Sequence, residues 1–137
     1  MHMNPYLFFN GNCEQAFKFY EKILGGKIVA MMSHEGTPAE AHVSPEWRKK
    51  IMHARLVAGD MVLMGSDAPP PNQEPMKGFS VSLQVEKPAD AERIFGALSK
   101  NGTVKMPLEE TFWAQRFGML VDQFGTPWMI NCEKAAA

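Results

Sequence analysis

The stretch Tyr6-Leu7-Phe8-Phe9-Asn10-Gly11-Asn12 decides the fold, because it begins a pattern that occurs twice in the chain. A short apolar run ends at turn residues and leads into an amphipathic segment that closes at Gly25-Gly26. The same order returns at Val81-Ser82-Leu83-Gln84-Val85, where a second amphipathic segment closes at Asn101-Gly102. The repeat aligns Ala16 with Ala91, Tyr20 with Phe95, and Ile23 with Leu98. A strand, a helix and further strands, written twice, predict paired modules whose function lies in a shared cleft.

Periodicity predicts the elements of the first module. Residues 5–9 read as a short buried strand that stops at Asn-Gly. Apolar side chains in residues 13–24 recur at the i, i+3, i+4, i+7 spacing of a helix lying on a sheet. Asn12 is the expected cap of this helix and Gly25-Gly26 its end. Further strands are predicted at 27–32, 52–57 and 61–64, and a short helix starts after Ser44 in the polar interval 33–50.

The second module repeats this order after a proline-rich linker at about 68–78. The predicted elements are a strand at 79–85, a helix from Pro88, a short strand at 104–105, a long strand at 112–121 and a closing strand at 127–132. The tail from Glu133 to Ala137 is expected to be disordered. We therefore predict a single domain over 1–137, with module one at about 5–67 and module two at about 79–132.

Composition excludes several classes of function. The net charge of −1 does not provide the basic face that nucleic acid requires, and Arg48-Lys49-Lys50 is too short to make one. No apolar run approaches the roughly 20 residues of a membrane span. Cys13 and Cys132 lack metal-like spacing and are expected to be free thiols in a reducing cytoplasm.

Three blocks of sequence carry a resemblance to a known family. They are Pro5 to Asn12 with Ala16-Phe17-Lys18-Phe19-Tyr20; His53-Ala54-Arg55-Leu56 with Gly59 to Met64 and Ser66-Asp67; and Phe112 to Gly118 with Asp122-Gln123-Phe124-Gly125 and Trp128. With these blocks the chain resembles the vicinal oxygen chelate superfamily, which has the glyoxalase and bleomycin-resistance fold, and within it the PhnB-like branch.

The resemblance implies an α+β fold of two paired βαβββ modules. These modules form an incomplete curled barrel with helices on the convex face and a groove inside, and such chains usually assemble as homodimers. The superfamily contains isomerases, dioxygenases, epimerases, thiol transferases and drug-sequestering proteins, so the fold does not fix the activity. PhnB-like proteins are sometimes labelled demethylubiquinone methyltransferases, but this chain has no glycine-rich loop for a methyl donor.

The resemblance also implies that the usual metal site is erased. Metal-dependent members hold the ion with His, Gln or Glu on the first and last strands of each module. The matching positions here are Pro5, Ser80, Leu63 and Met129; a register slip of one residue brings Val62 or Met64 and Trp128 or Ile130 instead. None of these is a usual ligand. We therefore expect no metal and no cofactor.

Two strands supply the candidate ligand-binding residues. If Ala54 and Leu56 face the helix, then His53 and Arg55 face the groove. His53 could act as an acid or base, or be a hydrogen-bonded structural residue. The candidates on the second module are Trp113, Gln115, Phe117 and Trp128. The first three alternate along one strand face, with Arg116 on the other, and suit a flat or apolar ligand; they could equally be core or dimer interface. Trp128 is expected in the core or the groove wall.

The remaining candidates are weaker. His34 and His42 lie in a loop with several glutamates, where they could bind a metal but usually would be surface residues. Glu109 and Glu110 are adjacent and point to opposite faces of a strand, so they cannot act as a pair. Cys13 is near a helix start, which can lower a thiol pKa, but it belongs to the apolar stripe and is expected to be buried.

Three hypotheses follow. The leading one is a protein that binds a small organic molecule in a metal-free groove. The second is an enzyme with His53 as acid or base and Gln115 or Arg55 as electrostatic partner. The third is a metal-dependent lyase or dioxygenase with ligands among His34, His42 and His53.

Overall fold

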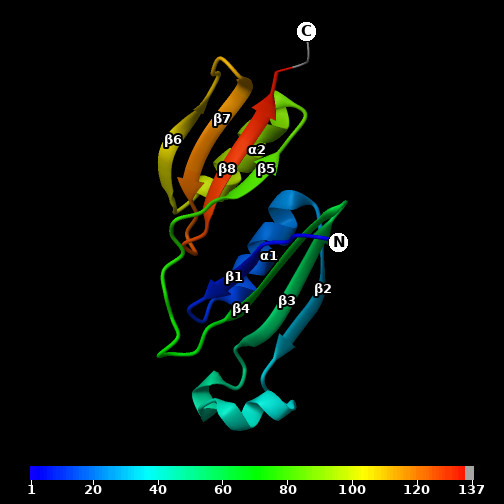
Figure 1. The fold of residues 1–137 in the computed structure, drawn as a ribbon, viewed down its shortest axis with the longest axis vertical. Coiled ribbons are helices and arrows are strands. Elements are labelled where there is room, and N and C mark those ends of the chain that lie inside the picture. The colour runs from blue at the N-terminus through cyan, green and yellow to red at the C-terminus, as the bar shows by residue number, and fades with distance from the viewer. Residues whose placement is uncertain (135–137) are drawn as a thin grey trace. The chain divides into compact units, whose positions relative to one another are not determined.

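The computed structural model describes residues 1–134, which form two compact units, residues 1–75 and 76–134. Each unit contains one βαβββ module, so the repeat in the sequence is a repeat in the structure (Figure 1). The boundary between the units falls inside the predicted linker. The α+β class and the two modules are confirmed; the joining of the two sheets into one incomplete barrel stays a prediction.

The first unit is a four-stranded sheet with one long helix. Its sheet order is β1-β4-β3-β2, with β1 parallel to β4 and the other neighbours antiparallel. Two short 3-10 helices lie between β2 and β3. The bounds are β1 Tyr6–Phe9, α1 Cys13–Leu24, β2 Lys27–Ser33, η1 Pro38–His42, η2 Pro45–Trp47, β3 Ile51–Ala58 and β4 Met61–Asp67.

The second unit has the same topology, with sheet order β5-β8-β7-β6 and β5 parallel to β8. The bounds are β5 Val81–Gln84, α2 Pro88–Ser99, β6 Thr103–Glu109, β7 Ala114–Val121 and β8 Pro127–Glu133. All four strands differ from the sequence prediction at their ends: β5 is shorter, β6 is longer, β7 starts later and β8 ends one residue later. β7 starts at Ala114 because the Thr111 hydroxyl oxygen accepts hydrogen bonds from the amides of Trp113 and Ala114, which turns the chain before the strand.

Each helix covers one face of its own sheet. Helix α1 packs on β2, β3 and β4, and α2 packs on β6, β7 and β8. Periodicity predicted the buried helix positions, except that Leu24, also expected on the buried face of α1, is half-buried; the buried residues are Cys13, Ala16, Phe17, Tyr20 and Ile23 in α1, and Ala91, Ile94, Phe95 and Leu98 in α2. Glycines let the helices approach closely. A Cβ atom at Gly65 would lie 2.9 Å from the Phe17 ring, and one at Gly118 would lie 2.6 Å from the Phe95 ring.

A buried carboxylate, rather than the predicted Asn12 side chain, caps helix α1. Asn12 occupies the N-cap position but its side chain makes no capping hydrogen bond. Asp67 Oδ1 accepts hydrogen bonds from the amides of Gly11 (3.0 Å) and Cys13 (2.9 Å), and Oδ2 accepts one from the amide of Ile51 (2.9 Å). Asp67 thereby ties the end of β4 to the helix start and to β3. At the other end, Gly25 closes the helix with a φ of 69°, as predicted.

Glu133 belongs to β8, so the predicted disordered tail is wrong for that residue; residues 135–137 lie outside the described residues. Among the described residues, no helix is both long and apolar enough to span a membrane.

Candidate functional site

The side of the first sheet that α1 does not cover carries His53 and Arg55. Ala54 and Leu56 are 0% and 1% exposed and lie on the helix side. Alternation along β3 therefore places His53 and Arg55 on the opposite side, as predicted. Pairing between strands brings four more side chains to this side: Tyr6 and Phe8 from β1, Met64 from β4, opposite both Tyr6 and Arg55, and Met32 from β2, opposite His53. We call these six residues the Tyr6–His53 face.

Tyr6 and His53 form a pair at the centre of this face. The Tyr6 hydroxyl lies 3.1 Å from Nδ1 of His53, and the two rings stack with centroids 5.8 Å apart and 23° between their planes. The ring of Phe8 lies 5.2 Å from that of Tyr6. Tyr6, Phe8 and Met32 are 37%, 57% and 45% exposed. An aromatic and thioether surface that also carries a hydroxyl, an imidazole and a guanidinium is typical of a binding site for a small organic molecule.

Sequence reasoning missed Tyr6 and Phe8, because it read residues 5–9 as a wholly buried strand. In the structure only Leu7 and Phe9 are buried, at 1% and 2% exposure. The sequence did contain a signal: in β1 the aromatic residues Tyr6 and Phe8 alternate with the apolar residues Leu7 and Phe9. Alternation could have indicated that one pair faces the helix and the other the open side.

The uncovered side of the second sheet is more polar. Register places Ser82 and Gln84 of β5 opposite Met129 and Asn131 of β8 on this side. The amide of Asn131 donates to Gln84 Oε1 (2.7 Å), and Gln84 Nε2 donates to the Ser82 hydroxyl oxygen (3.2 Å). Asn131 Oδ1 is buried and has no hydrogen-bond partner within the described residues. Ser82 and Gln84 of β5 therefore occupy the positions that Tyr6 and Phe8 occupy on β1, and polar groups replace the two aromatic rings.

The predicted stripe of Trp113, Gln115 and Phe117 is divided in the structure. A register shift between Ala114 and Arg116 interrupts the alternation along β7. Trp113 precedes the strand and packs against Phe117, with ring centroids 5.4 Å apart. Arg116 bonds Glu92 of α2 and so lies on the other side of the sheet, as predicted.

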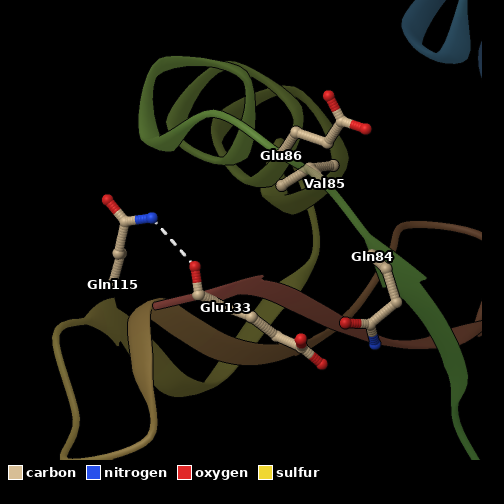
Figure 2. A pocket seen from close by; sticks show the side chains of 5 residues that line it. All are labelled: Gln84, Val85, Glu86, Gln115 and Glu133. Atoms are coloured by element: carbon tan, nitrogen blue, oxygen red, sulfur yellow. Dashed lines mark hydrogen bonds between the residues drawn. The ribbon is translucent and has the colours of Figure 1, made fainter. Parts of the chain in front are cut away.

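Gln115 lines a different feature, an open depression of about 510 Å³ at one end of the second sheet (Figure 2). Its amide nitrogen donates to the backbone carbonyl of Glu133 over 2.8 Å, so the amide is already engaged. The other lining residues are Gln84, Val85, Glu86 and Glu133. With two carboxylates, two amides and the apolar Val85, this depression has a mixed lining, unlike the aromatic stripe expected from the sequence.

Trp128 lies in the core. Its side chain is 2% exposed, and its indole nitrogen donates to Asp122 Oδ2 over 2.9 Å. It pairs with Val81 and Leu120 on the helix side of the second sheet. Of the two positions that the sequence left open for Trp128, the structure shows the core.

The positions carried over from metal-dependent relatives also have definite places. Leu63 is 7% exposed and faces the helix, so on β4 the residue on the open side is Met64, the slipped alternative. Met129 occupies the corresponding place on β8, whereas Pro5 and Ser80 precede their strands. His34 is buried with Nδ1 3.0 Å from the Lys50 carbonyl oxygen, and His42 is exposed. Residues 1–134 contain no group of three or more His, Cys, Asp or Glu that could hold a metal.

Cys13 is an inert thiol in this fold. It is fully buried, and burial raises its pKa far above the ordinary range, with the nearby charges of Asp67 and Glu14 adding to the effect. The helix start therefore does not activate it; desolvation outweighs the favourable amides, which Asp67 already occupies. The structure gives no support to a nucleophilic cysteine.

Comparison with known proteins agrees with this architecture. The profile of the Glyoxalase/Bleomycin resistance protein/Dioxygenase superfamily matches residues 2–130, and the chain belongs to this superfamily. It is 36% identical over 143 aligned positions to protein YjdN of Escherichia coli K12, covering 98% of this chain and 97% of that one. It is also 48% identical to protein PA1353 of Pseudomonas aeruginosa, whose crystal structure matches with a TM-score of 0.90 over 98% of this chain and 99% of that one.

A more distant structure shows the same fold. The PhnB protein of Bacillus cereus, named a putative 3-demethylubiquinone-9 3-methyltransferase, is 22% identical and matches with a TM-score of 0.81 over 96% of this chain and 99% of that one. The resemblance to PhnB-like proteins thus extends to the fold.

Proposed function

We propose that the protein binds a small organic molecule, and that the Tyr6–His53 face is the principal contact surface. The observation that carries this proposal is the stacked and hydrogen-bonded Tyr6–His53 pair on a sheet side rich in exposed apolar groups. A hydrogen-bonded ring pair is a preorganised surface, so a flat ligand can stack on it with little loss of conformational freedom. Neighbouring Phe8 and Met32 supply further apolar contact area.

Residues of the second unit extend the same proposal. Trp113 and Phe117 form an aromatic pair in contact, and Trp113 is 46% exposed. Phe117 is only 9% exposed, so Trp113 is the second aromatic surface for a ligand and Phe117 supports its ring. Gln115 contributes through the polar depression instead, and Trp128 contributes by supporting the sheet from within the core.

A second candidate function is catalysis with His53 as acid or base. It is favoured by the contact from Tyr6, because a hydrogen bond to one ring nitrogen orients the ring and fixes which nitrogen is available to a substrate. The methyltransferase activity in the name of the Bacillus cereus protein is not part of this proposal, since the chain lacks a glycine-rich loop for a methyl donor.

We further propose that the protein is a cytoplasmic homodimer that contacts neither nucleic acid nor membrane. Exposed apolar side chains outside the Tyr6–His53 face, such as Val104 and Met106 of the edge strand β6, support an assembly that covers part of them. Two buried, unpaired cysteines and a net charge of −1 fit a reducing compartment without a polyanionic partner. Sedimentation analysis of the purified protein tests the dimer, and a monomer mass at micromolar concentration would contradict it.

The binding function is tested by titrating the ¹⁵N-labelled protein with a panel of planar aromatic fragments. We expect shifts of the Tyr6, Phe8 and His53 signals, and we expect Phe8→Ala to weaken binding by about tenfold through lost stacking area. Phe79→Ala is the matched control, because Phe79 is 46% exposed, lies in the other unit and belongs to neither aromatic surface. Shifts confined to other residues would contradict the assignment. For catalysis, unchanged turnover of any identified substrate by His53→Ala would exclude the acid–base role.

A further inference from the structure

Arg55 differs from every other arginine in the chain. Arg48, Arg93 and Arg116 each form an ion pair, with Glu40, Asp90 and Glu92 respectively. Within residues 1–134, Arg55 has neither an ion pair nor a hydrogen bond from its side chain. It is exposed, and it stands on the Tyr6–His53 face opposite Met64 and Ala30. An arginine among aromatic and thioether groups, without a counter-charge, is available to an external anion.

The formal charges on strand residues of this side of the first sheet are those of two cations, Arg55 and Lys27. Residue pairing places Lys27 opposite Val57 on this side of the sheet, and His53 lies two positions before Arg55 along β3. The strand residues that register assigns to this side contain no Asp or Glu; they are Tyr6, Phe8, Lys27, Ala30, Met32, His53, Arg55, Val57, Val62, Met64 and Ser66. The carboxylate of β4, Asp67, is 3% exposed and is held by three backbone amides on the helix side.

The Tyr6–His53 contact can add a directed donor to this charge. When the Tyr6 hydroxyl donates to Nδ1, the neutral ring carries its proton on Nε2. Nε2–H is then a hydrogen-bond donor on the same side of β3 as Arg55, two positions away along the strand. Arg55 and His53 are thus two donors on one strand, and the rings of Tyr6 and Phe8 lie on the same side of the sheet. This combination matches a molecule with a planar apolar body and an oxyanion at one end.

We propose that the molecule bound by this protein is an anion: a planar, largely apolar compound whose oxyanion group, a carboxylate or a phosphoryl group, is held by Arg55 and by Nε2–H of His53. This inference rests on the proposed binding function and names the chemical class of its ligand. Arg55 supplies charge and bidentate geometry, and Tyr6 positions His53.

The test compares three probes of one shape, 2-naphthoate, 2-naphthyl phosphate and the neutral 2-naphthamide, by NMR titration of the full chain. We expect at least one of the two anions to bind ten or more times more tightly than the amide, and whichever anion is preferred identifies the oxyanion. Arg55→Gln should remove that preference while leaving the affinity for 2-naphthamide within a factor of two. Arg93→Gln, which alters an exposed arginine of the other unit, should leave all three affinities unchanged.

The outcomes separate this inference from the function on which it rests. Equal affinities for the anions and the amide, all weakened by Phe8→Ala, would overturn the anionic class and leave the binding function standing. Anion binding that Arg55→Gln does not weaken would also overturn it. Absence of binding by all three probes, in protein shown to be folded by its amide spectrum, would count against both proposals.

Discussion

The Tyr6 hydroxyl lies 3.1 Å from Nδ1 of His53, although the two residues stand 47 positions apart in the chain. The contact is possible because β4 lies between β1 and β3 and pairs with both, so that Met64 is the partner of Tyr6 on one side and of Arg55 on the other. The side chains of Tyr6 and His53 therefore meet across a whole strand. A contact of this length requires a tyrosine, since a phenylalanine has no hydroxyl to reach the imidazole.

Tyr6→Phe should change the orientation of the His53 ring while leaving the stability of the protein almost unchanged. The pair is exposed, so we expect the free energy of unfolding to change by less than about 1 kcal/mol. The ring nitrogens of His53 should nevertheless change their ¹⁵N chemical shifts, because the proton on the imidazole is no longer fixed by the hydroxyl. Long-range ¹H–¹⁵N spectra measure this directly. Unchanged His53 nitrogen shifts would show that the contact does not orient the ring.

Asp67→Ala should be among the most damaging single substitutions. It leaves the amides of Gly11, Cys13 and Ile51 without their acceptor in a buried place, and we expect a loss of about 3 kcal/mol or more. Urea unfolding followed by circular dichroism measures it. Asp60→Ala is the control, because Asp60 is an exposed carboxylate in the β3–β4 turn, and its loss should change stability by less than about 0.5 kcal/mol. Equal effects of the two substitutions would contradict the capping role.

Two glycines of the second unit should respond oppositely to alanine. At Gly118 the new methyl group would lie 2.6 Å from the Phe95 ring and 2.9 Å from the Leu108 backbone, and we expect destabilisation by about 1–3 kcal/mol. At Gly96 the methyl group would meet nothing within 4 Å, and alanine is the better helix former, so we expect stabilisation by about 0.5–1 kcal/mol. Thermal unfolding of both variants provides the comparison. A stabilised Gly118→Ala would show that helix α2 can move away from the sheet.

Stability should fall in alkaline solution, and Cys13 should account for part of the fall. Burial raises the pKa of Cys13 in the folded protein far above the ordinary value of a thiol. The unfolded chain therefore releases this proton at a lower pH than the folded protein does, and the contribution of Cys13 to stability is complete below about pH 9 and is lost as the pH rises beyond it. Above that pH the expected slope is roughly 1.4 kcal/mol per pH unit.

Urea unfolding of the wild type and of Cys13→Ala between pH 8 and 10.5 isolates this effect. Other groups that titrate in this range contribute equally to both proteins and cancel in the difference. The wild type should lose its advantage in unfolding free energy over Cys13→Ala as the pH increases. A difference independent of pH would show that the folded protein ionises Cys13 as easily as the unfolded chain does.

Much of the fold could be predicted from the sequence because both helices have apolar residues at regular spacing and glycine or proline at their ends. Ala16 and Ala91 are fully buried at matching places, as the repeat indicates. Asp67 was not predicted as the cap of α1, because local patterns locate a helix start but not an acceptor that arrives from a distant strand. Likewise, spacing alone could not reveal the shift after Ala114 that divides Trp113 from Gln115.

The candidate site was predicted in part. Alternation placed His53 and Arg55 on the open side of their strand, because the small and aliphatic neighbours Ala54 and Leu56 could only face the helix. Tyr6 was not anticipated, since its contact with His53 depends on parallel pairing between β1 and β4, which no short-range pattern contains. The pairing of strands, more than their identity, decides which side chains share a surface.

Asp67 also has a consequence for the order in which a newly made chain can mature. The first helix is synthesised early, yet the carboxylate that accepts its leading amides belongs to a residue 54 positions after Cys13. On the ribosome, α1 therefore lacks this acceptor until the last strand of its unit has emerged. The buried carboxylate of the second unit, Asp122, lies at a different place, in the turn between β7 and β8, and accepts hydrogen bonds from the amides of Phe124 and Thr126 and from the indole of Trp128 within that hairpin. During translation, the hydrogen bonds that cap α1 therefore form only after β4 has been made. The hydrogen bonds of Asp122 can form as soon as the β7–β8 hairpin has been made.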